Sequence, residues 1–82
     1  DKDMLYQLLL GTSGVSIVAS FKEEEKDRKC SVSLRTREEI DLNEIARHFG
    51  GGGHKKASGY TVMKGIDEAM QDFISYSGAI LI

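Results

Sequence analysis

The fold of this chain is decided by residues 41–56, which read DLNEIARHFGGGGHKK. Asp41 followed three residues later by Glu44 has the form of a capping box, which starts a helix. Apolar residues then recur at the i, i+3, i+4 and i+7 spacing of one helix face, at Leu42, Ile45, Ala46 and Phe49. We therefore predict an amphipathic helix that ends at Gly50, where glycine supplies a left-handed cap.

The run of four glycines after this helix is followed at once by His54, Lys55 and Lys56. Each glycine costs roughly 1 kcal/mol of backbone entropy relative to alanine, so four in succession indicate a functional need. Their backbone amides are open to close approach by an anion, and the adjacent cations favour a negative ligand. We predict a loop that holds a phosphate or sugar oxygen, followed by a short helical turn at residues 54–58.

Two well-known nucleotide-binding loops do not fit this glycine run. The P-loop requires a glycine directly before a lysine that is followed by serine or threonine, and no such triplet occurs. The dinucleotide fingerprint requires a third glycine three positions after the second, where this sequence has Lys55 or Lys56. The sequence therefore supports neither ATP hydrolysis nor hydride transfer, and a looser nest of backbone amides is the remaining hypothesis.

The segments before the central helix predict a further helix and two strands. Helical spacing of apolar residues between Met4 and Leu9 predicts a short opening helix, which a turn at residues 11–14 follows. Period-two alternation predicts strands over residues 15–22 and 30–35, which suit a hairpin. The charged run between these strands interleaves acids and bases, so we assign it to the solvated end of the hairpin.

The segments after the glycine run complete the expected fold. Residues 59–63 alternate as a third strand, and a last helix begins near Ile66. Residues 79–82 suit either an edge strand or the cut end of a longer protein. We expect a single domain over residues 1–82 of the α+β class, a small mixed or antiparallel sheet with packed helices and a glycine-rich loop at its rim.

Composition narrows the class of protein. The 82 residues are 40% hydrophobic and contain no run long enough to span a bilayer, so we expect a soluble domain without a membrane partner. Cys30 is the single cysteine, which fits the reducing cytoplasm. The net charge of -2 argues against a protein that coats nucleic acid. Residues 28–56, however, hold seven Lys or Arg against four Asp or Glu, which favours a phosphate-bearing ligand.

Three motifs together resemble a known family. They are VSLRT at residues 32–36, DLNEIA at 41–46 and FGGGGHKKASG at 49–59. They look like the C-terminal substrate-binding domain of DHH-family phosphoesterases, and the similarity covers nearly the whole chain from Val15 onward. It extends to bacterial oligoribonucleases that also act on 3′-phosphoadenosine 5′-phosphate, and to cyclic-di-AMP phosphodiesterases. Thr36 stands where the family commonly has serine, and Ser58 where it commonly has a second alanine.

The resemblance implies a division of labour between two domains. In the family, the N-terminal domain is named for an Asp-His-His motif, binds two manganese ions and performs the hydrolysis, while the C-terminal domain holds the nucleotide. No Asp-His-His motif occurs in these 82 residues, so the chain resembles part of a longer enzyme and is expected to be catalytically silent alone. The implied ligands are nucleotides or short single-stranded RNA. The implied partner is the covalently linked catalytic domain, and a homodimer of the parent protein is left open.

The resemblance also implies a set of substrate-binding residues, namely Arg35, Gly51, Gly52, Gly53 and His54. A guanidinium fork such as that of Arg35 binds phosphate at two points, and an imidazole donates a hydrogen bond to phosphate or stacks on a base. Further candidates, each with a solvated or turn-capping role as the alternative, are Thr36, Arg37, Lys55 and Ser58. We expect no catalytic residue and no metal ligand, because no base is placed to activate Ser58 and no carboxylate or cysteine stands at ligand spacing from the histidines.

Two other classes of function remain open from the sequence. Related domains are attached to alanyl-tRNA synthetases and single-strand exonucleases, so a stand-alone RNA-binding module is one alternative. The other is a structural or dimerisation domain in which the glycines only allow close packing.

Overall fold

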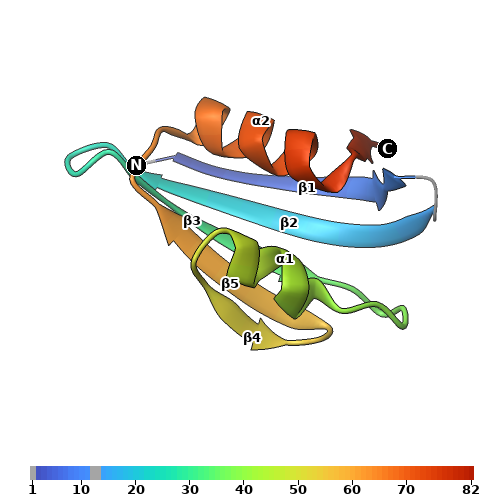
Figure 1. Ribbon diagram of the computed structural model, residues 1–82. Coiled ribbons are helices and arrows are strands. Elements are labelled where there is room, and N and C mark those ends of the chain that lie inside the picture. The colour runs from blue at the N-terminus through green and yellow to red at the C-terminus, as the bar shows by residue number, and fades with distance from the viewer. Residues whose placement is uncertain (1, 12–13) are drawn as a thin grey trace.

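The computed structural model describes residues 2–11 and 14–82, which form one six-stranded sheet and two helices (Figure 1). The strand order is β4-β5-β3-β2-β1-β6, and every neighbouring pair is antiparallel. The elements are β1 (Lys2–Leu10), β2 (Val15–Glu24), β3 (Lys29–Arg35), α1 (Leu42–His48), β4 (Gly52–His54), β5 (Ala57–Val62), α2 (Ile66–Ser77) and β6 (Ala79–Leu81). The fold is therefore α+β, as the sequence predicts, and its sheet is antiparallel.

The helices bury their apolar sides against one face of the sheet. Helix α2 contacts β2 and β6, and α1 contacts β4 and β5. In Figure 1, α2 runs along the sheet above β1 and β2, and α1 lies beside β5. Buried side chains from both helices and from the strands form a single cluster, which includes Leu8, Ile17, Phe21, Leu34, Leu42, Ala46 and Phe73.

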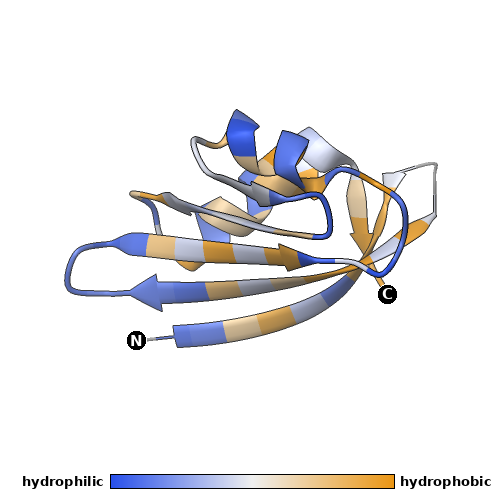
Figure 2. Ribbon diagram, turned by 90° about the horizontal axis from the view of Figure 1, so that it is seen from below, coloured by the Kyte–Doolittle hydropathy of each residue, from blue (hydrophilic) through white to orange (hydrophobic). Residues whose placement is uncertain are grey.

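The strands follow the two-residue alternation of a sheet with one buried face. In β3, for example, Cys30, Val32 and Leu34 are buried, while Ser33 between them and Arg35 after them are exposed. The same alternation is visible as changing bands of hydropathy along the strands in Figure 2. The face opposite the helices therefore carries the polar and small residues of the central strands, and it is this face that holds Arg35.

The expected opening helix is wrong, because the first residues form strand β1. This strand pairs with β2 over its whole length, from Lys2 opposite Glu23 to Leu10 opposite Val15. Pairing satisfies the backbone and buries Leu8 and Leu10 on the helix-covered face, while Leu5 remains 68% exposed. Long-range pairing thus prevails over the local helical spacing of a leucine-rich segment. The predicted turn at 11–14 lies partly outside the described residues.

Most of the other predicted elements are confirmed. Strands β2 and β3 form the predicted hairpin, α1 begins after Asp41, and α2 begins at Ile66. The Asp41 carboxylate caps α1 by accepting a hydrogen bond from the Asn43 amide at 3.0 Å. Of the two alternatives for residues 79–82, the edge strand is confirmed, since β6 pairs with β1. The helical turn expected at 54–58 is wrong, because these residues belong to β4, a turn and β5.

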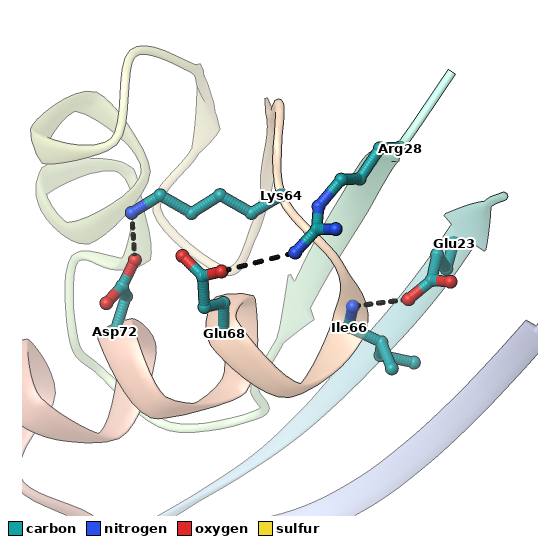
Figure 3. Close-up of polar contacts among 6 residues, drawn as sticks. All are labelled: Glu23, Arg28, Lys64, Ile66, Glu68 and Asp72. Atoms are coloured by element: carbon teal, nitrogen blue, oxygen red, sulfur yellow. Dashed lines mark hydrogen bonds and ion pairs between the residues drawn. The ribbon is translucent and has the colours of Figure 1, made fainter. Parts of the chain in front are cut away.

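The N-terminus of α2 is held by side chains from other elements, as Figure 3 shows. The residue before the helix, Gly65, has no side chain with which to cap it. The carboxylate of Glu23, from β2, accepts a hydrogen bond from the Ile66 amide instead. Lys64 pairs with Asp72 one and a half turns into the helix, and the exposed pair of Arg28 and Glu68 lies 3.5 Å apart. No helix in residues 2–11 or 14–82 is long and apolar enough to cross a membrane.

Tyr60 joins α1 to the core and carries a buried hydroxyl without a partner. Its ring stacks on Phe49 at a centroid distance of 4.6 Å and an interplanar angle of 16°. The hydroxyl oxygen has no hydrogen-bond partner within the part of the chain that the structure describes. Burial raises the pKa of this phenol well above its ordinary value, so the ring remains neutral. Packing of the ring, and not the hydroxyl, therefore accounts for the contribution of Tyr60 to stability.

We expect Tyr60→Phe to leave the free energy of unfolding unchanged or to raise it by up to about 1 kcal/mol. The reason is that an unpaired buried hydroxyl costs roughly 1–3 kcal/mol to bury, and phenylalanine retains the stacked ring. Urea denaturation measures the difference, with Tyr76→Phe as a control at a half-exposed tyrosine. A loss of more than about 1 kcal/mol in Tyr60→Phe alone would show that the hydroxyl is hydrogen-bonded in solution.

Candidate functional site

The glycine run does not form the free loop of amides that the sequence predicts. The Gly50 amide donates to the Arg47 carbonyl at 3.1 Å, and the Gly51 amide donates to the Ala46 carbonyl at 2.8 Å. Gly50 has the left-handed φ of 90° expected after a helix. Gly52 and Gly53 belong to β4, which pairs with β5 at the edge of the sheet. These glycines thus end a helix and begin an edge strand, and the Gly50 and Gly51 amides are bonded within the chain; substrate binding by Gly51, Gly52 and Gly53 stays a prediction.

Gly51 lies where a side chain has no room. A Cβ atom built on this residue is 2.1 Å from the Gly59 carbonyl oxygen and 2.5 Å from the Tyr60 Cβ atom. Real Cβ atoms do not approach other atoms so closely, so the backbone at the end of α1 rests directly on β5. Close packing of this kind is what we would expect if the glycines had the structural role that the sequence leaves open as an alternative.

The turn between β4 and β5 is fixed to two other elements through its carbonyl groups. The Lys55 carbonyl accepts a hydrogen bond of 2.7 Å from the Leu42 amide at the start of α1. The Lys56 carbonyl accepts one of 3.1 Å from the Thr36 amide just after β3. Lys56 is therefore held beside the end of the strand that carries Arg35.

A cleft of about 710 Å³ lies at this end of the sheet. Three cationic residues line it: Arg35 at the end of β3, Arg37 in the following loop, and Lys56 in the β4–β5 turn. The other lining residues are Gln7, Ser16, Ile17, Val18, Thr36 and Glu38. Gln7, Val18 and Arg35 stand opposite one another in register, so their side chains share the face that the helices leave uncovered.

The wall of the cleft between Arg35 and Arg37 is anchored to β2. The Thr36 hydroxyl donates to the Ser16 carbonyl at 2.9 Å and accepts from the Glu38 amide at 3.1 Å. The Glu38 carboxylate accepts a hydrogen bond of 2.6 Å from the Ser16 amide. The Thr36 hydroxyl and the Glu38 carboxylate thus both bond to the Ser16 backbone. These bonds fix the loop that carries Arg35 and Arg37.

The cations of the cleft differ in their pairing. Within residues 2–11 and 14–82, neither the Arg35 nor the Arg37 guanidinium has a hydrogen-bond or ion-pair partner. The Lys56 ammonium lies 2.7 Å from a carboxylate oxygen of Glu39. This ammonium lowers the pKa of the Glu39 carboxyl, first by hydrogen bonding and then by charge. Two free guanidinium groups and one paired ammonium therefore face a common space, an arrangement suited to a ligand with phosphate groups.

The other predicted substrate-binding residues lie outside this cleft. His54 stands opposite Ala57, which stands opposite Arg35, so His54 is two strands away on the same face, roughly 10 Å from Arg35. Lys55 is exposed in the adjoining turn. Ser58 is buried on the helix-covered face, where its hydroxyl donates to the Leu42 carbonyl at 2.9 Å. Ser58 is therefore buried and Gly51 packs on β5, whereas Arg35, Thr36 and Arg37 meet in the cleft; substrate binding by each of them stays a prediction.

Sequence reasoning did not place Gln7, Ser16 and Glu38 at the site. Gln7 is missed because the sequence predicts a helix for its segment, and a helix gives Gln7 no partner on a neighbouring strand. The alternation of Gln7 with the buried Leu8 and Leu10 is the signal that a strand assignment would have used. Ser16 and Glu38 enter through backbone hydrogen bonds between segments distant in sequence, which no local pattern encodes.

The fold and the cleft define a small α+β domain with a cationic cleft at one end of its sheet. Comparison with family models gives a match to the DHHA1 domain over residues 3–81. The chain belongs to the DHHA1 domain family, the domain associated with DHH-family phosphoesterases. A search of solved structures gives no match to this chain.

We expect Gly51→Ala to lower the free energy of unfolding by at least about 2 kcal/mol, because its methyl group has no room against β5. The matched control is Gly52→Ala, whose Cβ atom meets only the Asn43 side-chain oxygen at 3.4 Å. The control is expected to change the free energy by no more than about 0.5 kcal/mol. Chemical denaturation of both variants measures the difference. Equal stability of the two would contradict the close approach of Gly51 to β5.

Proposed function

We propose that this domain binds the phosphate end of a nucleotide or short single-stranded RNA within a DHH-family phosphoesterase of the oligoribonuclease or 3′-phosphoadenosine 5′-phosphate phosphatase type. The observation that supports this proposal is the pair of unpartnered guanidinium groups, Arg35 and Arg37, in one cleft with Lys56. Guanidinium groups bind phosphate with two parallel hydrogen bonds, and such charge-assisted bonds are about twice as strong as neutral ones.

The dimensions of the cleft support a ligand of nucleotide size. Its volume of about 710 Å³ lies within the usual range of small-molecule sites. The one carboxylate that lines it, Glu38, accepts the Ser16 amide and is thereby turned toward β2. Glu38 keeps its negative charge, but the described lining holds three cations against this one carboxylate, so the cleft is net positive and attracts anionic ligands.

Under this proposal the chain binds and orients, and hydrolysis belongs to a separate domain. Manganese, which the family resemblance implies, would supply metal-activated hydrolysis in that domain. In residues 2–11 and 14–82, no three His, Cys, Asp or Glu side chains are grouped to hold a metal ion. The donors of this part of the chain do not fit manganese, so the role of its residues is to hold the phosphate group.

We expect Arg35→Gln and Arg37→Gln each to raise the Kd of adenosine 5′-monophosphate about tenfold, the cost of one charge-assisted hydrogen bond. Calorimetric titration of the chain measures this, and titration of 3′-phosphoadenosine 5′-phosphate and a dinucleotide ranks the ligand classes. Arg28→Gln is the matched control, since it removes an arginine from the far end of β3.

The control variant is expected to bind like the unmodified chain. An equal loss of affinity in all three arginine variants would show a general charge effect, and no binding of any of the three ligands would contradict the proposed function. Tight binding of RNA without any preference for a terminal phosphate would favour the stand-alone RNA-binding module instead.

A further inference from the structure

The ion pair between Lys56 and Glu39 lies at the border of the cleft. It is separate from the hydrogen bonds by which Thr36 and Glu38 hold the loop to Ser16. Lys56 lines the cleft, while Glu39 lies beside it in the loop between β3 and α1 and is 88% exposed. Neighbouring Glu38 accepts a hydrogen bond from the Ser16 amide, whereas the Glu39 carboxylate pairs, among the residues that the structure describes, with the Lys56 ammonium. The fold therefore places one exposed carboxylate against one of the three cations.

We propose that Glu39 is an internal competing anion, which holds the Lys56 ammonium so that a phosphate group must displace a carboxylate to use it. This inference rests on the proposed function, because it concerns the same cleft. It assigns to Glu39 a role in setting affinity, although Glu39 itself is not required to touch the ligand.

The consequence depends on the charge of the ligand. A phosphodiester carries one negative charge, whereas a terminal phosphomonoester carries nearly two at pH 8, since its second pKa is about 6. Hydrolysis of a phosphodiester thus produces a group that a purely cationic cleft would hold more tightly than the substrate. By occupying Lys56 and repelling a dianion more than a monoanion, Glu39 offsets this difference. The residue therefore limits retention of the phosphomonoester product.

Exposure sets the size of the effect. Both partners of the pair are well exposed, with side-chain exposures of 48% for Lys56 and 88% for Glu39. Exposed pairs contribute little in water, so removal of the competitor should change affinity by about two- to fivefold. The lowered pKa of the Glu39 carboxyl agrees with a pair that is formed in the absence of ligand.

The test uses a matched pair of ligands that differ by one charge, adenosine 5′-monophosphate and its methyl phosphodiester, titrated at pH 8. We expect Glu39→Gln to lower the Kd of the monophosphate about two- to fivefold and that of the diester by less. In a Lys56→Gln background, the same substitution is expected to have a clearly smaller effect on both ligands. Glu68→Gln is the control, because it breaks an exposed ion pair with Arg28 and makes the same change in net charge at the other end of β2 and β3.

Each outcome decides the proposal. Equal gains for Glu39→Gln in the presence and absence of Lys56, or a similar gain for Glu68→Gln, would show a long-range charge effect and overturn it. No change in the monophosphate Kd would overturn it as well, while Arg35→Gln still weakens binding and the proposed function stands. If the unmodified chain binds neither ligand and Glu39→Gln does not restore binding, the proposed function fails and this inference fails with it.

Discussion

The close approach of Gly51 to β5 fixes the edge of the sheet and the turn beside the cleft. Because the backbone at the end of α1 rests on Gly59 and Tyr60, the chain leaves the helix directly into the edge strand β4. Strand β4 is only three residues long, so the turn to β5 follows at once. The carbonyls of that turn then accept the amides of Leu42 and Thr36, which brings Lys56 to the end of β3. A contact without any side chain thus positions a cation of the cleft.

The charged side chains in and beside the cleft differ in whether they have a partner within the chain. The chain as a whole has a net charge of -2, yet the Arg35 and Arg37 guanidinium groups at one end of the sheet have no partner among residues 2–11 and 14–82. Neither neighbouring carboxylate forms an ion pair with them, because Glu38 accepts the Ser16 amide and Glu39 lies against the Lys56 ammonium. Overall charge is therefore a poor guide to the ligand of this domain, and local pairing is a better one.

The sequence predicts those elements whose local pattern agrees with their long-range contacts. Helix α1 has its cap at Asp41 and a regular apolar stripe, and β3 alternates from Cys30 to Leu34. The predictions of both elements are therefore confirmed. Strand β1 is missed because its leucines also fit a helix, and only pairing with β2 decides between the two. Strand β4 is missed because glycines carry no side-chain period. Of the candidate site, Arg35, Thr36 and Arg37 meet in the cleft, whereas Ser16 and Glu38 depend on hydrogen bonds between distant segments.

We propose that cationic side chains, and not the glycine amides, form the anion site. A nuclear magnetic resonance titration of the ¹⁵N-labelled chain with adenosine 5′-monophosphate tests this most directly. We expect the largest shifts at the side-chain Nε–H groups of Arg35 and Arg37 and at the Lys56 amide. Gly50 and Gly51 should move little, because their amides remain bonded to α1. Large shifts confined to Gly50–Gly53, with both arginine signals unmoved, would contradict the account.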